Sequence, residues 1–147
     1  MRRPAFVALA ALLAAGGCKE SLEPSTSAWQ ATLAPRGGPS AVRGSVAAVS
    51  EGVHTRANLA VSNAEEGRSF AWEIREGTCS DAAAARVGGR AAYPEFRADS
   101  LGAGNAQATV SENLRVSRTY HAVLLEPTEA RAVVACGALE QRSFSTP

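Results

Sequence analysis

The sequence has no apolar run long enough to cross a bilayer as a helix, and it has no excess of basic residues. A transmembrane helix needs about 20 predominantly apolar residues, whereas the run Ala5–Ala15 is far shorter and is followed by the charged Lys19 and Glu20. The formal net charge of the 147 residues is +1, and no segment concentrates lysine and arginine. Proteins that bind nucleic acid carry a basic patch or stripe, so the composition argues against that class.

Histidines and nucleophile motifs are also scarce. The chain has only two histidines, His54 and His121, and no Gly-x-Ser-x-Gly motif of the kind that exposes a nucleophilic serine. Neither histidine lies in a recognisable nucleophile motif. Aspartate and glutamate are plentiful, however, and a carboxylate pair assembled by the fold leaves no mark in the sequence, so a hydrolase of that kind stays open.

The start of the chain has the order of regions found in a secretory signal. Arg2 and Arg3 precede the apolar run, and the small residues Ala15–Gly17 lie directly before Cys18. This arrangement resembles a lipobox, although the position three before the cysteine is more often leucine. We therefore predict cleavage before Cys18 and lipidation of that cysteine, which places the protein at a membrane of the bacterial cell envelope, facing the periplasm or the exterior.

The cysteine count supports this prediction. A single exposed thiol is reactive in an oxidising compartment, and acylation of Cys18 removes it, leaving Cys79 and Cys136 as an even number. Cleavage at the same place by an ordinary signal peptidase, with Cys18 left free, is the alternative. The predicted parts are a signal peptide, a lipidated cysteine with a polar tether, one domain and a short tail: 1–17, 18–28, 29–141 and 142–147.

Within the predicted domain the apolar residues recur with a period of two, as in half-buried β-strands. The alternating runs are Trp29–Leu33, Val53–Val61, Phe70–Ile74 and Ala106–Val110. Glycine and asparagine between the runs permit the positive φ of tight turns. This pattern predicts an all-β Greek-key sandwich or flattened barrel of seven to eight strands.

The stretch Glu76–Asn105 departs from the strand pattern. It is rich in glycine, alanine and arginine, with Tyr93, Pro94 and Phe96 as its few large anchors. We predict that it is mostly loop. Loops of this length in compact domains are usually functional or tied down, and Cys79 lies near the start of this one.

Two segments carry the most specific pattern in the chain, Trp72–Cys79 (W-E-I-R-E-G-T-C) and Val133–Leu139 (V-V-A-C-G-A-L). Together they resemble the copper/zinc superoxide dismutases and their lipoprotein relatives. In that family a His-x-His strand is followed by a glycine and a cysteine, and the last strand reads Ala-Cys-Gly. Tyr93–Gly102 is similar to the family's loop, and Tyr120–Leu125 to the strand that bears a further copper histidine. The resemblance covers about 29–139.

The resemblance implies a disulfide between Cys79 and Cys136 within a superoxide dismutase-like fold. Such a bridge closes a loop of about 58 residues, for which chain entropy predicts ~4 kcal/mol of stabilisation. Because the net stability of a domain is only about 5–15 kcal/mol, we expect reduction to lower the melting temperature markedly.

The chain departs from the family at the metal-binding positions. Glu73 and Arg75 stand where the resemblance places two copper histidines, and Leu125 stands where it places another. These side chains cannot hold copper while it changes oxidation state, so we predict no catalytic residues and no metal cofactor. Both histidines alternate with the apolar side chains of their strands, which predicts His54 and His121 on the outer sheet surface. His121, on the same side as Leu125, is the residual candidate ligand.

The resulting hypothesis is a lipoprotein with a non-catalytic binding or structural role. The alternative is a copper/zinc-dependent superoxide dismutase or a copper-binding protein with a rearranged site. Glu73 and Arg75 share a strand face and are interpreted either as a solvated pair worth less than ~1 kcal/mol or as the charged rim of a surface. In the second interpretation Val123 and Leu125 supply the apolar part, and the surface binds a protein partner.

Overall fold

The computed structural model describes residues 26–36, 41–128 and 130–142. The predicted signal peptide, Cys18 and the tether up to residue 25 lie outside the described residues, as does the predicted tail after Arg142. The described residues contain one 3₁₀ turn, η1 (Arg90–Ala92), and eight strands: β1 (Ser27–Pro35), β2 (Arg43–Glu51), β3 (His54–Ser62), β4 (Ser69–Glu76), β5 (Phe96–Arg97), β6 (Gly104–Val110), β7 (Tyr120–Leu125) and β8 (Val133–Arg142). The prediction of an all-β fold with seven to eight strands is confirmed.

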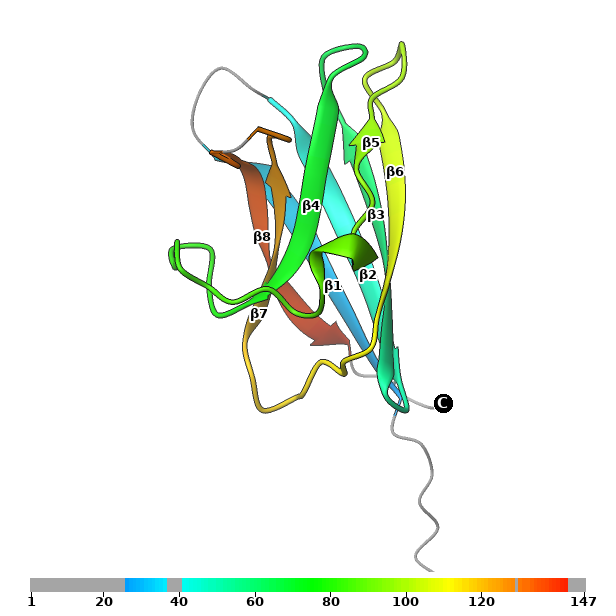
Figure 1. Ribbon diagram of the computed structural model, residues 1–147, viewed down its shortest axis with the longest axis vertical. Coiled ribbons are helices and arrows are strands. Elements are labelled where there is room, and N and C mark those ends of the chain that lie inside the picture. The colour runs from blue at the N-terminus through cyan, green and yellow to red at the C-terminus, as the bar shows by residue number, and fades with distance from the viewer. Residues whose placement is uncertain (1–25, 37–40, 129, 143–147) are drawn as a thin grey trace, which may run out of the picture.

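The strands form one antiparallel sheet in the order β5-β4-β7-β8-β1-β2-β3-β6. β3 pairs with β6 rather than with β4, and β4 pairs with β7, so the chain crosses over as in a Greek key. Figure 1 shows β4 and β7 in front of β1 and β2, with the short β5 beside β6. The two sheet edges therefore come near each other and the sheet is a nearly closed, flattened barrel.

The apolar side chains of the period-two pattern fill the inside of this barrel. In β3 the side chains of Ala57, Leu59 and Val61 are buried and their neighbours are exposed. Trp29 and Tyr120 meet edge to face across the core, with ring centroids 5.6 Å apart. This burial accounts for the alternation in β3, because that strand has one dry and one wet face.

Val53 is an exception to the predicted strand pattern. The sequence places it as the first inward residue of the third strand, but it is 68 % exposed in the turn between β2 and β3. Gly52, with a φ of +58°, reverses the chain there, so the strand begins only at His54. The expectation that His54 lies on the outer sheet surface is confirmed, since this residue is exposed.

β4 and β7 are buried on both faces along most of their length, as is 134–137 in β8. Every residue of β7 is buried, and so is 70–74 in β4. The inward side chains, such as Trp72 and Leu124, belong to the core. The outward side chains of β4, β7 and the neighbouring part of β8 form what we call the outer face: Ala71, Glu73, Arg75, His121, Val123, Leu125 and Cys136.

The loop predicted for Glu76–Asn105 is present between Gly77 and Ala103 and contains η1 and β5, while Glu76 ends β4 and Asn105 lies in β6. Its first part returns along β4, where the Val87 N–H donates to the Ile74 carbonyl at 2.9 Å. Tyr93 then anchors its middle, with its ring 5.2 Å from that of Trp72 and its hydroxyl donating to the Val87 carbonyl at 2.7 Å. The loop is thus fixed against the barrel on one side of β4.

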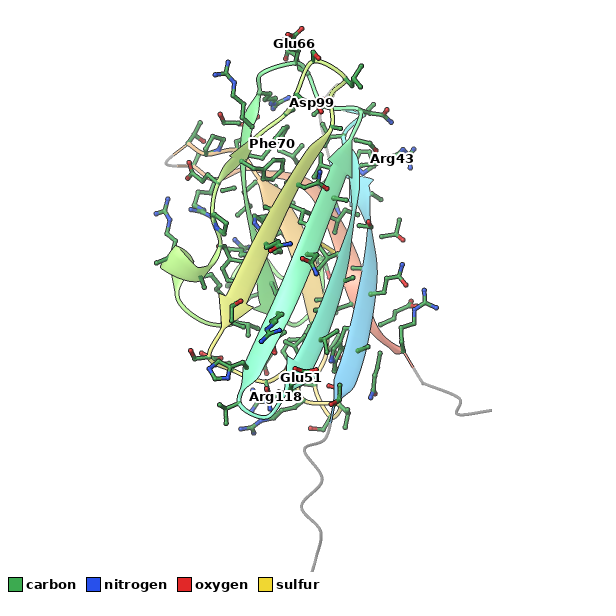
Figure 2. The ribbon with its side chains drawn as sticks, turned by 90° about the vertical axis from the view of Figure 1, so that its right-hand side faces the viewer. Arg43, Glu51, Glu66, Phe70, Asp99 and Arg118 are labelled. Atoms are coloured by element: carbon green, nitrogen blue, oxygen red, sulfur yellow. A yellow bond between two sulfur atoms is a disulfide. The ribbon has the colours of Figure 1, made fainter. Side chains whose placement is uncertain are left out.

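The two ends of the barrel differ in what they contain. Figure 2 shows Glu66 and Asp99 at one end and Glu51 and Arg118 at the other. The start of β1 lies at the second end, because Ser27 pairs with Ser50 beside the turn that follows β2. We call this end the Glu51 end.

Candidate functional site

A disulfide joins the loop after β4 to the outer side of β8. Cys79 and Cys136 are bonded, with their Cα atoms 6.0 Å apart, so the predicted pairing is confirmed. Gly77 begins the loop with a φ of +101°, a conformation that favours glycine, and its N–H donates to the Thr119 carbonyl at 2.8 Å. Because β7 lies between β4 and β8 in the sheet, the loop passes over β7 to reach Cys136.

This loop covers apolar side chains of the outer face. Cys79 packs against a small buried cluster: Ala71, Val123, Leu125 and Cys136. One interpretation of the sequence places Val123 and Leu125 on an exposed surface for a protein partner, with Glu73 and Arg75 at its rim. That expectation is corrected, because Val123, Leu125 and Glu73 are buried and Arg75 is mostly so.

Glu73 is the centre of the outer face and contacts three arginines. Its Oε1 accepts from both Nε and Nη2 of Arg75 at 2.7 Å. Its Oε2 lies 3.3 Å from Nη1 of Arg86 and 3.3 Å from Nη2 of Arg131. The interpretation of Glu73 and Arg75 as a solvated pair is therefore wrong, since Glu73 is only 3 % exposed and has two further cationic partners.

Different local structures bring the three arginines to Glu73. Arg75 lies two residues further along β4 and so projects from the same face. Arg86 is held beside Arg75 by an isolated antiparallel bridge, and its Nε also donates to the Gly88 carbonyl at 3.3 Å. Arg131 lies in the connection between β7 and β8 at a φ of +43°, where its N–H donates to the Thr128 carbonyl at 3.0 Å.

The cluster of Glu73, Arg75, Arg86 and Arg131, which we call the Glu73 cluster, combines one carboxylate with three guanidiniums. If all four are ionised, its formal charge is +2. Arg86 and Arg131 are missed by the sequence analysis because they lie 13 and 58 residues from Glu73. Short motifs do not report contacts at such separations, and nothing in the sequence around either arginine indicates a contact with Glu73.

His121 lies beside this cluster, opposite Arg75 in the pairing of β4 with β7. Its Nδ1 donates to the Gly77 carbonyl at 2.9 Å, which leaves Nε2 as the unprotonated nitrogen of the neutral ring. Burial lowers the pKa of His121, and the nearby Arg75 cation acts in the same direction, while the hydrogen bond to Gly77 opposes the shift. The prediction of an exposed His121 is wrong, because the loop after β4 covers it.

The donor set on the outer face does not fit copper or zinc. Leu125 has no donor atom, the Glu73 carboxylate is shared by three guanidiniums, and His121 is the one imidazole there. Among the described residues, no group of three or more His, Cys, Asp or Glu side chains is placed to hold a metal ion. A catalytic zinc takes three protein ligands and a structural zinc takes four, so these residues supply too few.

A hollow opens near the Glu51 end, with a volume of about 350 Å³. Two of the charged residues that line it form an ion pair, in which Arg118 contacts both carboxylate oxygens of Glu76 at 2.7 and 2.6 Å. These contacts raise the pKa of Arg118. Asn113 also lines it, and its Oδ1 is buried without a hydrogen-bond partner. The hollow is lined by two glutamates and two arginines, whose formal charges cancel, whereas the Glu73 cluster has three arginines for one glutamate. The outer face is therefore the stronger candidate.

No protein-family model matches this chain, and no curated protein matches it. In the part of the chain that the structure describes, no helix is long and apolar enough to span a membrane. The sequence motifs and the geometry of the outer face are therefore the observations that bear on the function.

Proposed function

We propose that this chain is an exported lipoprotein of the bacterial cell envelope, anchored through Cys18, whose barrel is a non-catalytic relative of the copper/zinc superoxide dismutases. The proposal gives the barrel a binding or structural role. The signal-like order of 1–17 supports export, and the Trp72–Cys79 and Val133–Leu139 motifs support the relationship. The disulfide and the all-β barrel are consistent with both.

The observation that carries the non-catalytic assignment is the Glu73 cluster. Glu73 and Arg75 occupy two positions at which the resemblance places copper ligands, and they are bonded to each other at 2.7 Å. Arg86 and Arg131 add two further positive charges within 3.3 Å of the same carboxylate. A metal cation placed there meets three positive charges at short range, where Coulomb repulsion is strong.

Metal analysis of the purified mature protein tests this assignment. After loading with copper and zinc and passage through a desalting column, we expect far less than one metal ion per chain and no superoxide dismutase activity. Two matched variants locate any residual binding: His54→Gln removes the exposed imidazole, and His121→Gln removes the buried one. Tightly held, stoichiometric copper that is lost in His121→Gln would overturn the proposal in favour of a rearranged copper site.

Labelling with a fatty-acid analogue tests the anchor separately. In cells that express the full chain, we expect label on the wild-type protein and none on Cys18→Ser, which should be recovered without detergent. Label that persists in the Cys18→Ser variant would show that another residue carries the lipid. An unlabelled wild-type protein would indicate an ordinary signal peptide.

A further inference from the structure

We propose that the Glu73 cluster is a binding site for a small oxyanion, such as phosphate or sulfate, which Arg86 and Arg131 hold between them. This proposal deepens the proposed function, because it rests on the absence of a metal at the same face and names a ligand class for the binding role.

The Glu73 cluster has more positive than negative charges. Three guanidiniums surround one carboxylate, so two positive charges lack a counter-charge within the cluster. His121 does not supply one, because the ring is neutral or positive. Glu126 contacts Arg68 at 2.5 Å, so that carboxylate already has a cation of its own. Partly buried cations are costly without counter-charges, and an anion bound here would offset that cost.

The distances show which arginines have capacity for a second acceptor. Arg75 places two nitrogens at 2.7 Å from Oε1, which is a full charge-assisted contact. Arg86 and Arg131 both contact the other oxygen, Oε2, at 3.3 Å, which is longer than the ~2.7–2.9 Å typical of such bonds. Their interaction with Glu73 is correspondingly weaker, and each guanidinium has further N–H groups.

The same distances bring the two arginines within reach of one ligand. Since Arg86 Nη1 and Arg131 Nη2 are each 3.3 Å from one atom, they lie at most twice that distance apart. An oxyanion with two acceptor oxygens can accept from both when each N–H···O contact is about 2.8 Å. Guanidiniums are well suited to this, because their planar fork matches the oxygens of phosphate and carboxylate groups.

Access from solvent differs between the two sides of the cluster. The side chains of Arg86 and Arg131 are 33 % and 20 % exposed, whereas that of Glu73 is 4 % exposed. An anion therefore reaches the arginines without any opening of the barrel. The bridge between Arg75 and Arg86 and the turn at Arg131 fix the backbone of both arginines, and such preorganisation reduces the entropy lost on binding.

Titration of the mature protein with inorganic phosphate, followed by calorimetry and by amide chemical shifts, tests the site. Chloride maintains constant ionic strength, and sulfate serves as a second probe. We expect binding by the wild-type protein and an affinity at least about tenfold lower in Arg86→Gln and in Arg131→Gln, since one charge-assisted hydrogen bond is worth about that factor. Arg43→Gln is the matched control, because Arg43 is an exposed arginine on β2 (Figure 2), far along the chain and on another part of the sheet.

Three results would overturn the inference: no binding of either probe, equal affinity in the two loop variants and the wild type, or an equal loss in Arg43→Gln. Metal content is measured on the same samples. Stoichiometric copper would contradict the proposed function itself, whereas a metal-free protein that ignores phosphate and sulfate would contradict only the anion site.

Discussion

Glu73 neutralises part of the charge of three arginines, so its replacement affects more than one contact. In Glu73→Gln the three guanidiniums lose their shared anion while remaining partly buried. Removing one partner of a buried ion pair destabilises proteins by about 3–5 kcal/mol, and we expect a loss in this range from urea unfolding. Glu140→Gln on the exposed side of β8 is the control. A loss below ~1 kcal/mol in Glu73→Gln would show that the cluster is energetically unimportant.

His121 gives the stability of the barrel a dependence on pH. Its pKa in the folded protein is lowered by burial, so between the folded and unfolded pKa values the unfolded chain binds more protons. The contribution of His121 to the free energy of unfolding is therefore fully present above the ordinary histidine pKa of about 6.5. It decreases as the pH falls below that value.

Urea unfolding at pH 7.5, 6.5 and 5.5 checks this dependence. We expect a flatter profile in His121→Gln, whose side-chain amide can still donate to the Gly77 carbonyl, and an unchanged profile in His54→Gln. Identical profiles for the wild type and His121→Gln would assign the pH dependence to other groups.

At the scale of single elements, the last strand requires a glycine. A Cβ atom on Gly137 would lie 2.1 Å from the Thr32 carbonyl oxygen, so β1 and β8 approach each other more closely than any side chain permits. We expect Gly137→Ala to destabilise the protein by at least about 2 kcal/mol, in the range of overpacked cores. Gly89→Ala is the control, because nothing lies within 4 Å of a Cβ there. Equal unfolding midpoints for the two variants would contradict this account.

The disulfide stabilises the loop that covers the outer face. Gly77 is bonded to Thr119 and His121, but the hydrogen bonds described for residues 78–84 stay within the loop. The disulfide is therefore its main link to β8. We expect Cys79→Ser/Cys136→Ser to lose ~4 kcal/mol, which corresponds to a fall in melting temperature of roughly 10 °C or more. Faster proteolysis between residues 77 and 85 should accompany the fall. An unchanged melting temperature, with the loop still protected, would show that other contacts hold it.

The alternation of β1, β3 and β6 could be predicted from the sequence because each of these strands has one wet face. The outer sides of β4 and β7 could not, since outward Glu73 and His121 look like solvent-exposed residues until a loop is placed over them. Alternation reports which way a side chain points, but it does not report what lies beyond the sheet. Arg86 and Arg131 reach Glu73 only through the bridge to β4 and the turn before β8, neither of which has a sequence signature.

At the scale of the whole molecule, both ends of the described domain lie at the Glu51 end. Ser27 pairs with Ser50, and Ala28 pairs with Arg142 at the end of β8. The eight residues between Cys18 and Ser27 can extend over roughly 30 Å at most. Anchoring at Cys18 therefore predicts that this end faces the bilayer.

Cross-linking to lipid tests this orientation. A photoreactive group at Val53 or Val116, both exposed near the Glu51 end, should label lipid more strongly than one at Leu101, which is exposed in the Asp99–Gly102 turn. Cys18→Ser should abolish the difference. Equal labelling at all three positions in the anchored protein would show that the tether does not orient the domain.

The pairing of Ala28 with Arg142 has a topological consequence. When the two ends of a domain are adjacent, they can be joined by a linker and the chain can be cut at another place without loss of strand pairs. Here a short linker from β8 to β1 would permit new termini in the exposed Glu65–Glu66 turn. Such a circular permutant would keep the outer face intact while moving the point of attachment to the opposite end of the barrel. The end of the barrel at which the domain is attached can thus be changed without changing the fold.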